Sequence, residues 1–161
     1  MHKKAEMIGE VFKYLLVALF AVMILVFGYA MVNLLKEREC KTELAKFEID
    51  LKGLDKSLSY GSRELQSHIV PCNVDKIYFF DMSKSIAPER FNDIPLMKNA
   101  VASRSSKNVF LIEASDIKRS FYAGAFEIAE PHYICFKPKL NKISFFAEGA
   151  GESTKIMKAE G

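Results

Sequence analysis

The chain has 161 residues and a formal net charge of +3, with basic and acidic residues spread along its length. Because there is no polybasic or polyacidic stretch, the charge pattern predicts no nucleic-acid partner. The 13 phenylalanines and six tyrosines, without a tryptophan, favour a β-rich core.

Residues 14–35 form an uncharged apolar run of 22 residues. As a helix rising about 1.5 Å per residue, the run is about 33 Å long and can cross a bilayer core of about 30 Å. The alternative is a buried helix of a soluble domain, but such helices seldom stay apolar for this length on every face. The run therefore predicts one membrane-spanning helix and a lipid bilayer as a partner.

The charges on the two flanks of the run do not determine its orientation in the membrane. Each flank carries three lysines or arginines near the run, so the positive-inside rule gives no direction. A short basic tail followed by a long apolar run is typical of a signal anchor, which favours a cytoplasmic N-terminus and a C-terminal domain outside. A cleaved secretory signal has a shorter apolar region and an A-x-A site, which is missing after this run. The basic residues are Lys3, Lys4 and Lys13 before the run and Lys36, Arg38 and Lys41 after it.

A helical stripe follows the apolar run. From Cys40 to Leu58 the apolar residues recur at spacings of 4, 3, 4, 3 and 4, which is one face of an α-helix. We expect this amphipathic helix to cover the sheet of the head, with a coiled-coil dimer as the alternative. We expect Gly53 to weaken the helix without ending it, and Gly61 to be its C-cap. The stripe consists of Cys40, Leu44, Phe47, Leu51, Leu54 and Leu58.

Short β-strands dominate the predicted C-terminal domain. About 125 residues follow the apolar run, enough for one domain with its own core. We expect 63–70 and 76–81 to form a first hairpin, and 95–102 to be a short helix that begins at its proline. Exposed loops at 82–94 and 114–119 are where a binding site is expected. Six or so short strands in sequence favour a mostly antiparallel sheet. The later strands are expected at 109–112, 120–129, 133–137, 142–148 and 154–158.

No motif predicts catalysis, a metal or a cofactor. The glycines of 148–153 lack the GK[ST] order of a phosphate loop and predict a hairpin turn. His68 with Cys72, and His132 with Cys135, have spacings that could supply zinc ligands. However, His132 and Cys135 are three residues apart in an expected strand and so point to opposite faces. We therefore expect no metal site and no enzymatic activity, although catalytic residues are often distant in sequence.

The three cysteines allow one disulfide. If the domain lies outside the cytosol, oxidising conditions favour a bond. Cys72–Cys135 is the expected pair because both residues lie at ends of expected strands. Cys40 lies on the helix near the membrane, far along the helix axis from Cys72 unless the chain doubles back. Cys40 is then free or pairs with another copy, and three unpaired thiols are the alternative.

The N-terminal residues 3–12, KKAEMIGEVF, resemble the class III signal peptides of archaeal pilins and archaellins, in the type IV pilin superfamily. Lys3 and Lys4 match the basic pair of that pattern, Ala5 precedes the cleavage site, Glu6 becomes the new N-terminus and Glu10 is at mature position five. The resemblance implies that a prepilin peptidase removes residues 1–5 on the cytoplasmic face. It also implies that Glu10 neutralises the amino terminus of a neighbouring subunit, since an unpaired charge in an apolar filament core is costly.

Three positions depart from the family pattern. Ala5 and Glu6 stand where the archaeal proteins usually have Gly and Gln, and Lys13 stands at mature position eight, where pilins are apolar. Lys13 lies three residues after Glu10, so the two side chains can pair on one helix face, and Lys13 can extend to the lipid headgroups. An ordinary ion pair beneath a membrane anchor is therefore the alternative to a pilin-type role for both residues.

Together these features predict an α+β chain with pilin-like architecture. A long N-terminal transmembrane helix continues into an amphipathic helix that packs on a mostly antiparallel β-sheet head. The expected divisions are a cytoplasmic tail at 1–13, a transmembrane helix at 14–35, a helical extension at 36–60 and an extracytoplasmic head at 61–161. The resemblance implies a structural subunit of an archaeal cell-surface pilus or pseudopilus, packed through its N-terminal helix against copies of itself or other pilin-like subunits. The alternative is a permanently anchored binding domain without a filament role.

Overall fold

The computed structural model describes residues 2–159, with side chains from Phe12 onward apart from that of Asp55. Contacts divide the chain into two compact units, residues 1–41 and residues 42–161. We call them the N-terminal unit and the head. The division falls inside the predicted helical extension.

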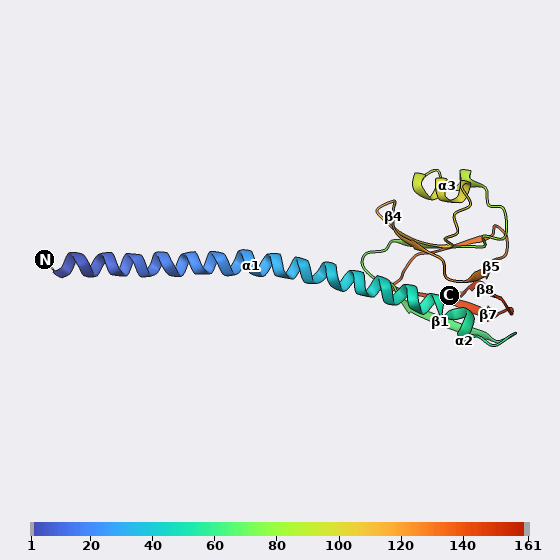
Figure 1. The fold of residues 1–161 in the computed structure, drawn as a ribbon, viewed down its shortest axis with the longest axis horizontal. Coiled ribbons are helices and arrows are strands. Elements are labelled where there is room, and N and C mark those ends of the chain that lie inside the picture. Colours follow the sequence, from blue (N-terminus) through green and yellow to red (C-terminus); the bar gives the residue numbers. More distant parts are fainter. Residues whose placement is uncertain (1, 160–161) are drawn as a thin grey trace. The chain divides into compact units, whose positions relative to one another are not determined.

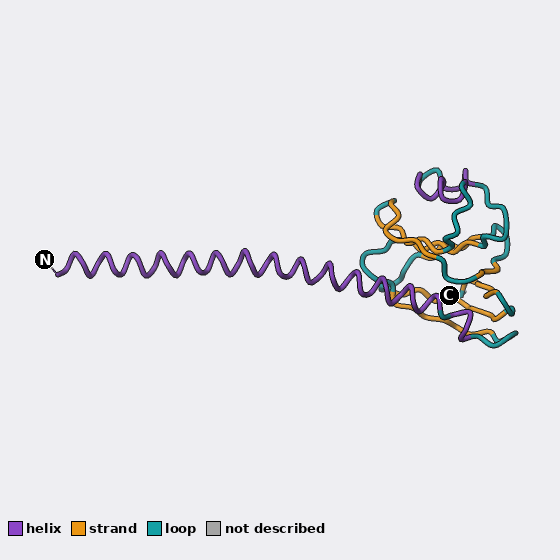
Figure 2. Tube along the Cα trace, viewed as in Figure 1, coloured by secondary structure: helices purple, strands orange, loops and turns teal. Residues whose placement is uncertain are grey.

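The N-terminal unit is helical throughout its described residues. It belongs to α1 (His2–Lys52), an unbroken helix of 51 residues (Figures 1 and 2). The sequence favours a helix here because leucine, alanine and methionine are frequent and no proline occurs before Pro71. Gly28 leaves the helix intact, and a Cβ at that position would meet open space. The predicted long apolar N-terminal helix is confirmed.

The last turns of α1 supply apolar side chains to the head. Leu44, Phe47 and Leu51 are buried, and so are Leu54 and Leu58 after α1 has ended. Their spacing places them on one side of the helical path, and the charged residues Lys46 and Asp50 between them are exposed. The predicted amphipathic stripe is therefore confirmed for these five residues.

Gly53 has a larger effect than the sequence predicted. α1 ends one residue before it, and a four-residue helix, α2 (Leu54–Ser57), follows. The Gly53 N–H still makes its helical bond, at 3.1 Å to the carbonyl four residues earlier, so the helical path is interrupted rather than lost. The extended backbone of Leu58 closes α2, and Gly61, with φ 73°, lies in the next turn instead of capping the helix.

Eight strands in the described part of the head form two sheets. The strands are β1 (Arg63–Ile69), β2 (Lys76–Phe80), β3 (Val109–Glu113), β4 (Asp116–Phe121), β5 (Ala125–Glu127), β6 (Tyr133–Phe136), β7 (Lys142–Gly149) and β8 (Ser153–Lys158). Sheet A has the order β1-β7-β8-β5 and sheet B the order β4-β3-β2-β6. Only the β5–β8 pair is parallel among these strands. The head thus has the predicted antiparallel character, but in two sheets instead of one.

β1 and β2 do not form the predicted hairpin. β1 pairs with β7, with Ile69 opposite Lys142, while β2 pairs with β3 and β6 in the other sheet. Cys72 and Asn73 both have φ of 42°, and the turn that contains them carries the chain from sheet A to sheet B. The reason is burial: β2 is apolar on both faces, as a central strand requires, whereas β1 is a largely exposed edge strand.

The predicted strand 120–129 is divided in two. β4 takes up most of the expected loop 114–119, and β5 follows after Gly124, whose φ is 93°. Ala114 and Ser115, with φ of 47° and 74°, form the turn between β3 and β4. Such left-handed turns usually contain Asn or Gly, so the Ala-Ser pair did not reveal this hairpin in the sequence.

Aromatic side chains fill the space between the two sheets. Phe79 of β2 contacts Phe126, Phe136 and Phe145, with ring centroids 5.4–5.5 Å apart. None of the four side chains is more than 8% exposed. Since Phe126 and Phe145 come from sheet A, these contacts hold the two sheets together.

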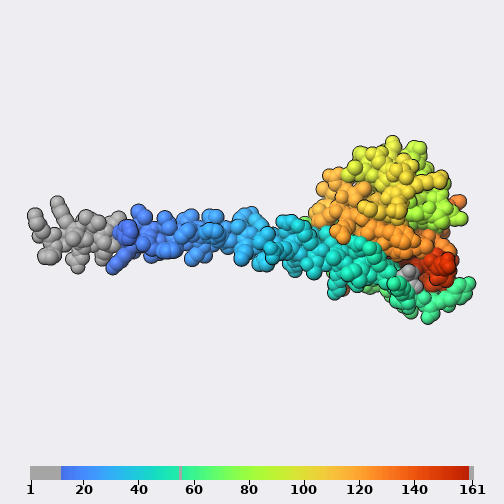
Figure 3. Space-filling view, in the orientation of Figure 1, coloured from blue at the N-terminus to red at the C-terminus, as the bar shows by residue number. Residues whose placement is uncertain are grey.

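A second apolar layer lies on the other face of sheet B. There a 3₁₀ turn, η1 (Pro88–Phe91), and helix α3 (Pro95–Ala102) cover the sheet, and they form the outer surface of that side of the head (Figures 1 and 3). Met97 of α3 is fully buried in the same cluster as Phe80 of β2 and Phe110 of β3. The helix begins at its proline, as predicted.

Gly149 allows the turn after α2 to lie against sheet A. Its N–H donates to the Ser62 carbonyl at 3.1 Å, and its carbonyl accepts from the Gly61 N–H at 2.8 Å. A Cβ at position 149 would lie 2.5 Å from the Ser59 carbonyl oxygen, so only glycine fits without a shift of the backbone. The turn that follows, with Gly151 at φ 85°, is the hairpin turn that the sequence predicted.

Candidate functional site

The apolar run of α1 is the most prominent candidate site. The large apolar side chains from Phe12 to Leu35 are 38–75% exposed, and consecutive residues place them on every side of the helix. The helix is long and apolar enough to cross a membrane. Apolar surface costs about 25 cal/mol per Å² in water, so a surface of this extent needs an apolar partner. The helix could therefore serve as a membrane anchor.

The predicted processing and assembly residues lie at the start of α1. Their backbone is helical, and their side chains lie outside the described residues. Lys13, just beyond them, is described and its side chain is exposed. Cleavage and assembly through this segment therefore stay predictions. The residues are Lys3, Lys4, Ala5, Glu6 and Glu10.

The structure corrects the predicted disulfide. Cys135 carries a free thiol, whereas Cys40 and Cys72 are both disulfide-bonded. Cys135 lies on β6, and Cys72 lies beside β4, because the Lys118 ammonium donates to the Cys72 carbonyl at 3.0 Å. β4 and β6 are opposite edges of sheet B, about 14 Å apart at a strand spacing of about 4.8 Å. This separation is beyond the reach of a disulfide.

We expect one thiol per chain to react before reduction. In denaturant without a reductant, iodoacetamide should modify Cys135 alone in protein purified from its native membrane, and after reduction it should modify all three cysteines. Peptide mass mapping identifies the labelled residue. Labelling of Cys40 or Cys72 before reduction, or protection of Cys135, would contradict this assignment.

A cleft of about 830 Å³ lies beside β6 in the head. Arg63, Phe146 and Cys135 are among the residues that line this cleft. The guanidinium of Arg63 lies over the Phe146 ring, 4.3 Å from the ring centroid. Cys135 is paired in register with Tyr78 of β2. Burial, followed by a hydrogen bond to the Cys135 thiol, raises the pKa of Tyr78. Tyr78 is therefore a neutral phenol near neutral pH.

A smaller cavity of about 280 Å³ adjoins His68. The imidazole lies between the rings of Phe47 and Phe145, with centroids 6.2 and 5.6 Å away, and its Nε2 is buried without a hydrogen-bond partner. Burial lowers the pKa of His68, while the charge of Asp50 opposes this shift. His68 is thus neutral at pH 7, and its protonation in acid would destabilise the folded state. In the described part of the chain, no three metal-ligating side chains gather at one place.

The turn between β6 and β7 exposes an unusual residue. Lys139 and Lys142 exchange backbone hydrogen bonds of 2.9 and 3.0 Å, so Leu140 and Asn141 form a two-residue turn. Both have left-handed backbones, with φ of 51° and 56°, a conformation that costs a leucine about 1–2 kcal/mol. The Leu140 side chain is 98% exposed. The strands expected at 133–137 and 142–148 leave a short connection here, but no pattern in the sequence marked Leu140.

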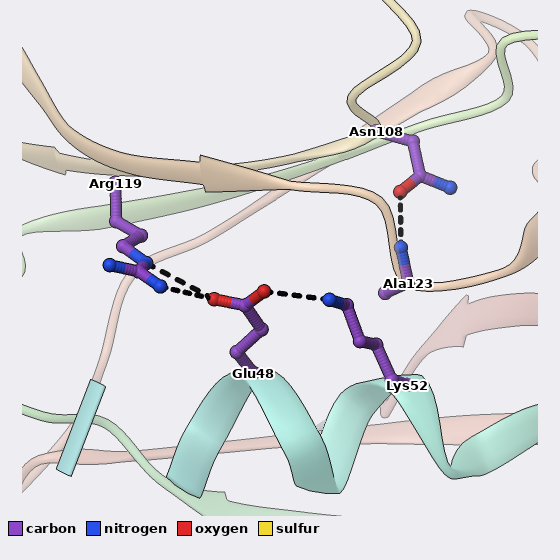
Figure 4. Close-up of polar contacts among 5 residues, drawn as sticks. All are labelled: Glu48, Lys52, Asn108, Arg119 and Ala123. Carbon is purple, nitrogen blue, oxygen red and sulfur yellow. Dashed lines mark hydrogen bonds and ion pairs between the residues drawn. The ribbon is translucent and has the colours of Figure 1, made fainter. Parts of the chain in front are cut away.

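Glu48 links the last turns of α1 to β4. Its carboxylate accepts hydrogen bonds from Arg119, at 3.1 Å from Nε and 2.7 Å from Nη2, and from Lys52 Nζ at 2.7 Å (Figure 4). Burial acts to raise the pKa of Glu48, but Lys52 and Arg119 outweigh it and hold the pKa below its ordinary value of 4.5. The ionised carboxylate is therefore the form that fastens the helix to sheet B.

Replacing Glu48 by glutamine should remove part of the acid sensitivity of the head. A carboxyl group with a lowered pKa stabilises the fold fully above pH 4.5 and loses this effect as the pH falls below that value. We expect Glu48→Gln to lower the free energy of unfolding by about 1 kcal/mol at pH 7, and by less in acid, in urea unfolding of the full chain in detergent. Glu152→Gln, at an exposed turn, is the matched control and should change little at either pH. Equal losses for Glu48→Gln at pH 7 and pH 3 would contradict the proposed role.

Searches of protein-family models, curated proteins and solved structures find no match to this chain. The features that bear on function are thus those of its own residues: the exposed apolar helix, the two-sheet head and the state of the cysteines.

Proposed function

We propose that the chain is a single-pass, membrane-anchored structural subunit of the pilin-like type, with its head outside the cytoplasm. The observation that carries this proposal is the exposed apolar run of 14–35, which lies within one unbroken helix. A helix that is apolar on every face can insert into a bilayer, and it can also pack against the same helix of neighbouring subunits. One surface thus serves both anchoring and assembly.

Two further features support the proposal. Cys40 and Cys72 are disulfide-bonded, and disulfides persist in oxidising compartments, which favours a head outside the cytosol. The KKAE pattern with Glu10 supports removal of residues 1–5 by a prepilin peptidase, which would leave Glu10 to pair with the new amino terminus of a neighbour. Under this proposal the partners are the bilayer, copies of the chain and the peptidase.

Lys13 favours a second candidate, a permanently anchored binding domain. Its side chain is exposed next to the apolar run, where it can reach the lipid headgroups. In the core of a filament the same ammonium would lose its water and would need a partner. The cleft beside β6 is the place in the head where such a domain would bind its ligand.

Cysteine cross-linking in the native membrane separates the two candidates. Single cysteines are placed in turn at residues 22–25, one helical turn of exposed side chains, in a Cys135→Ser chain, and the membranes are oxidised. If subunits pack through α1, covalent dimers should form at some of these positions and not at others, because one helix face meets the neighbour. Tyr60→Cys, an 85% exposed position in the head, controls for random collision. Monomers at all four helix positions would contradict the filament proposal and leave the anchored binding domain.

A further inference from the structure

We propose that the β6–β7 turn is a membrane-binding tip of the head, with an anionic bilayer surface as its partner. The tip consists of Lys137, Lys139, Leu140, Asn141 and Lys142. This inference rests on the proposed membrane anchor and adds a second contact with the same bilayer.

The side chains of the tip have the chemistry of a bilayer interface. Leu140 is 98% exposed at the apex, and the lysines at 137, 139 and 142 are all exposed around it. None of the three lysines forms an ion pair with an acidic side chain of the described residues. An apolar side chain can enter the headgroup layer while flanking ammonium groups meet anionic lipids, and the lysine stems can extend toward the headgroups.

The backbone conformation of the turn indicates that Leu140 does not stabilise the fold. Both turn residues are left-handed, a geometry that Asn-Gly would satisfy without strain. The turn is nevertheless rigid, because Lys139 and Lys142 close it by two hydrogen bonds and the Asn141 carbonyl accepts from the Val70 N–H at 2.8 Å. A strained residue held in a fixed, fully exposed position is a sign of function.

The tip lies at the end of the head where the chain enters. Ile69, at the end of β1, is opposite Lys142 and is itself 70% exposed. Ile69 also lines the same small cavity as Glu43, the second residue of the head. The head begins at Thr42, only seven residues after Leu35, the last residue of the uncharged run. The tip therefore lies at the end of the head that is joined to the proposed anchor.

A tryptophan probe tests the contact directly, because the chain has no tryptophan of its own. The full chain carrying Leu140→Trp is reconstituted into phosphatidylcholine vesicles with or without phosphatidylglycerol, and its fluorescence is quenched with brominated lipids. The matched control is Tyr60→Trp, 85% exposed and bridged to Gly149 at the opposite end of sheet A. We expect quenching of the Leu140→Trp probe to be several-fold stronger than that of the control in anionic vesicles, and to weaken in pure phosphatidylcholine and at high salt.

Flotation of the same vesicles shows whether a negative result contradicts the proposed anchor or only the proposed membrane contact of the tip. If the chain does not float with the vesicles, the proposed anchor is wrong and the tip inference fails with it. If the chain floats but the two probes are quenched equally, the anchor stands and the tip inference is overturned. A blue shift of the Leu140→Trp probe without quenching by brominated lipid would indicate a neighbouring head as the partner, and would also overturn it.

A second variant tests whether the leucine serves the fold. Leu140→Asn fits the left-handed turn better, so it should raise the melting temperature of the chain in detergent or leave it unchanged. Substitution of the three lysines by glutamine in the Leu140→Trp chain should likewise preserve melting while abolishing the excess quenching in anionic vesicles. A clear fall in melting temperature for Leu140→Asn would mean that the leucine is structural, and would contradict the proposal.

Discussion

Replacing both Ile24 and Leu25 by arginine should release the chain from its membrane. The two residues lie at the middle of the uncharged run and are 71% and 73% exposed, so their side chains would face the centre of the bilayer. Arginine there costs about 3 kcal/mol relative to an apolar residue on the insertion scale, and two of them about 6 kcal/mol. This corresponds to about four orders of magnitude in the insertion equilibrium. Alkaline carbonate extraction should therefore move the variant from the membrane pellet to the supernatant.

The control for this variant exchanges the two apolar side chains without a charge. Ile24→Leu with Leu25→Ile keeps the apolar content of the run and should stay in the pellet like the unmodified chain. If the arginine variant also stays in the pellet, in the same amount as the control, then the apolar run of α1 is not what holds the chain in the membrane. The proposed function would then lose the observation that carries it.

Asn108→Ala should destabilise the head by about 3 kcal/mol. Asn108 is 1% exposed; its Oδ1 accepts from the Ala123 N–H at 2.9 Å (Figure 4), and its Nδ2 donates to the Gly124 carbonyl. Alanine would leave two backbone groups without their partners, at a cost of about 1–3 kcal/mol each where they are buried. These two hydrogen bonds fix the segment in which the chain passes from β4 in sheet B to β5 in sheet A, so their loss should affect both sheets.

The measurement is urea unfolding of the full chain in detergent, followed by circular dichroism. Asn92→Ala is the matched control, because Asn92 is exposed and its side chain accepts one bond, from Lys98 Nζ at 2.9 Å. Its removal should change the free energy of unfolding by less than about 0.5 kcal/mol. Equal, small effects of the two substitutions would show that the side chain of Asn108 does not hold the two sheets together.

The parts of the fold that depend on local pattern could be predicted from the sequence. The uncharged run and the spacing of Leu44, Phe47 and Leu51 are properties of neighbouring residues, and the helix they predict is the one observed. Pro95 marked the start of α3 for the same reason, since proline is favoured in the first turn of a helix. Gly53 is one local error, because a residue of low helix propensity did interrupt the helix there.

The parts that depend on distant pairings could not be predicted. Which strand lies beside β1 is decided by burial of the whole sheet, and the nearest strand in sequence, β2, belongs to the other sheet. The same limitation produced the wrong disulfide, since strand ends that look equivalent in sequence lie at opposite edges of sheet B for Cys72 and Cys135.

Single residues in unusual backbone positions were also invisible in the sequence. Leu140 adopts a left-handed conformation that its residue type disfavours. The backbone propensity of leucine therefore did not predict this conformation. Asn108 resembles an ordinary loop residue in sequence, and only the three-dimensional structure shows that its side chain bonds to Ala123 and Gly124, in the segment between β4 and β5. Both residues matter because of long-range contacts or exposure, which a local pattern does not record.

The most direct test of a pilin-like subunit is the intact mass and N-terminal sequence of the protein isolated from its native membrane. We predict a chain that begins at Glu6, because cleavage after Ala5 is the step that commits such a subunit to assembly through Glu10. A chain that begins at Met1 or His2 would contradict this, and the protein would then be a permanently anchored domain whose partner is to be sought at the head.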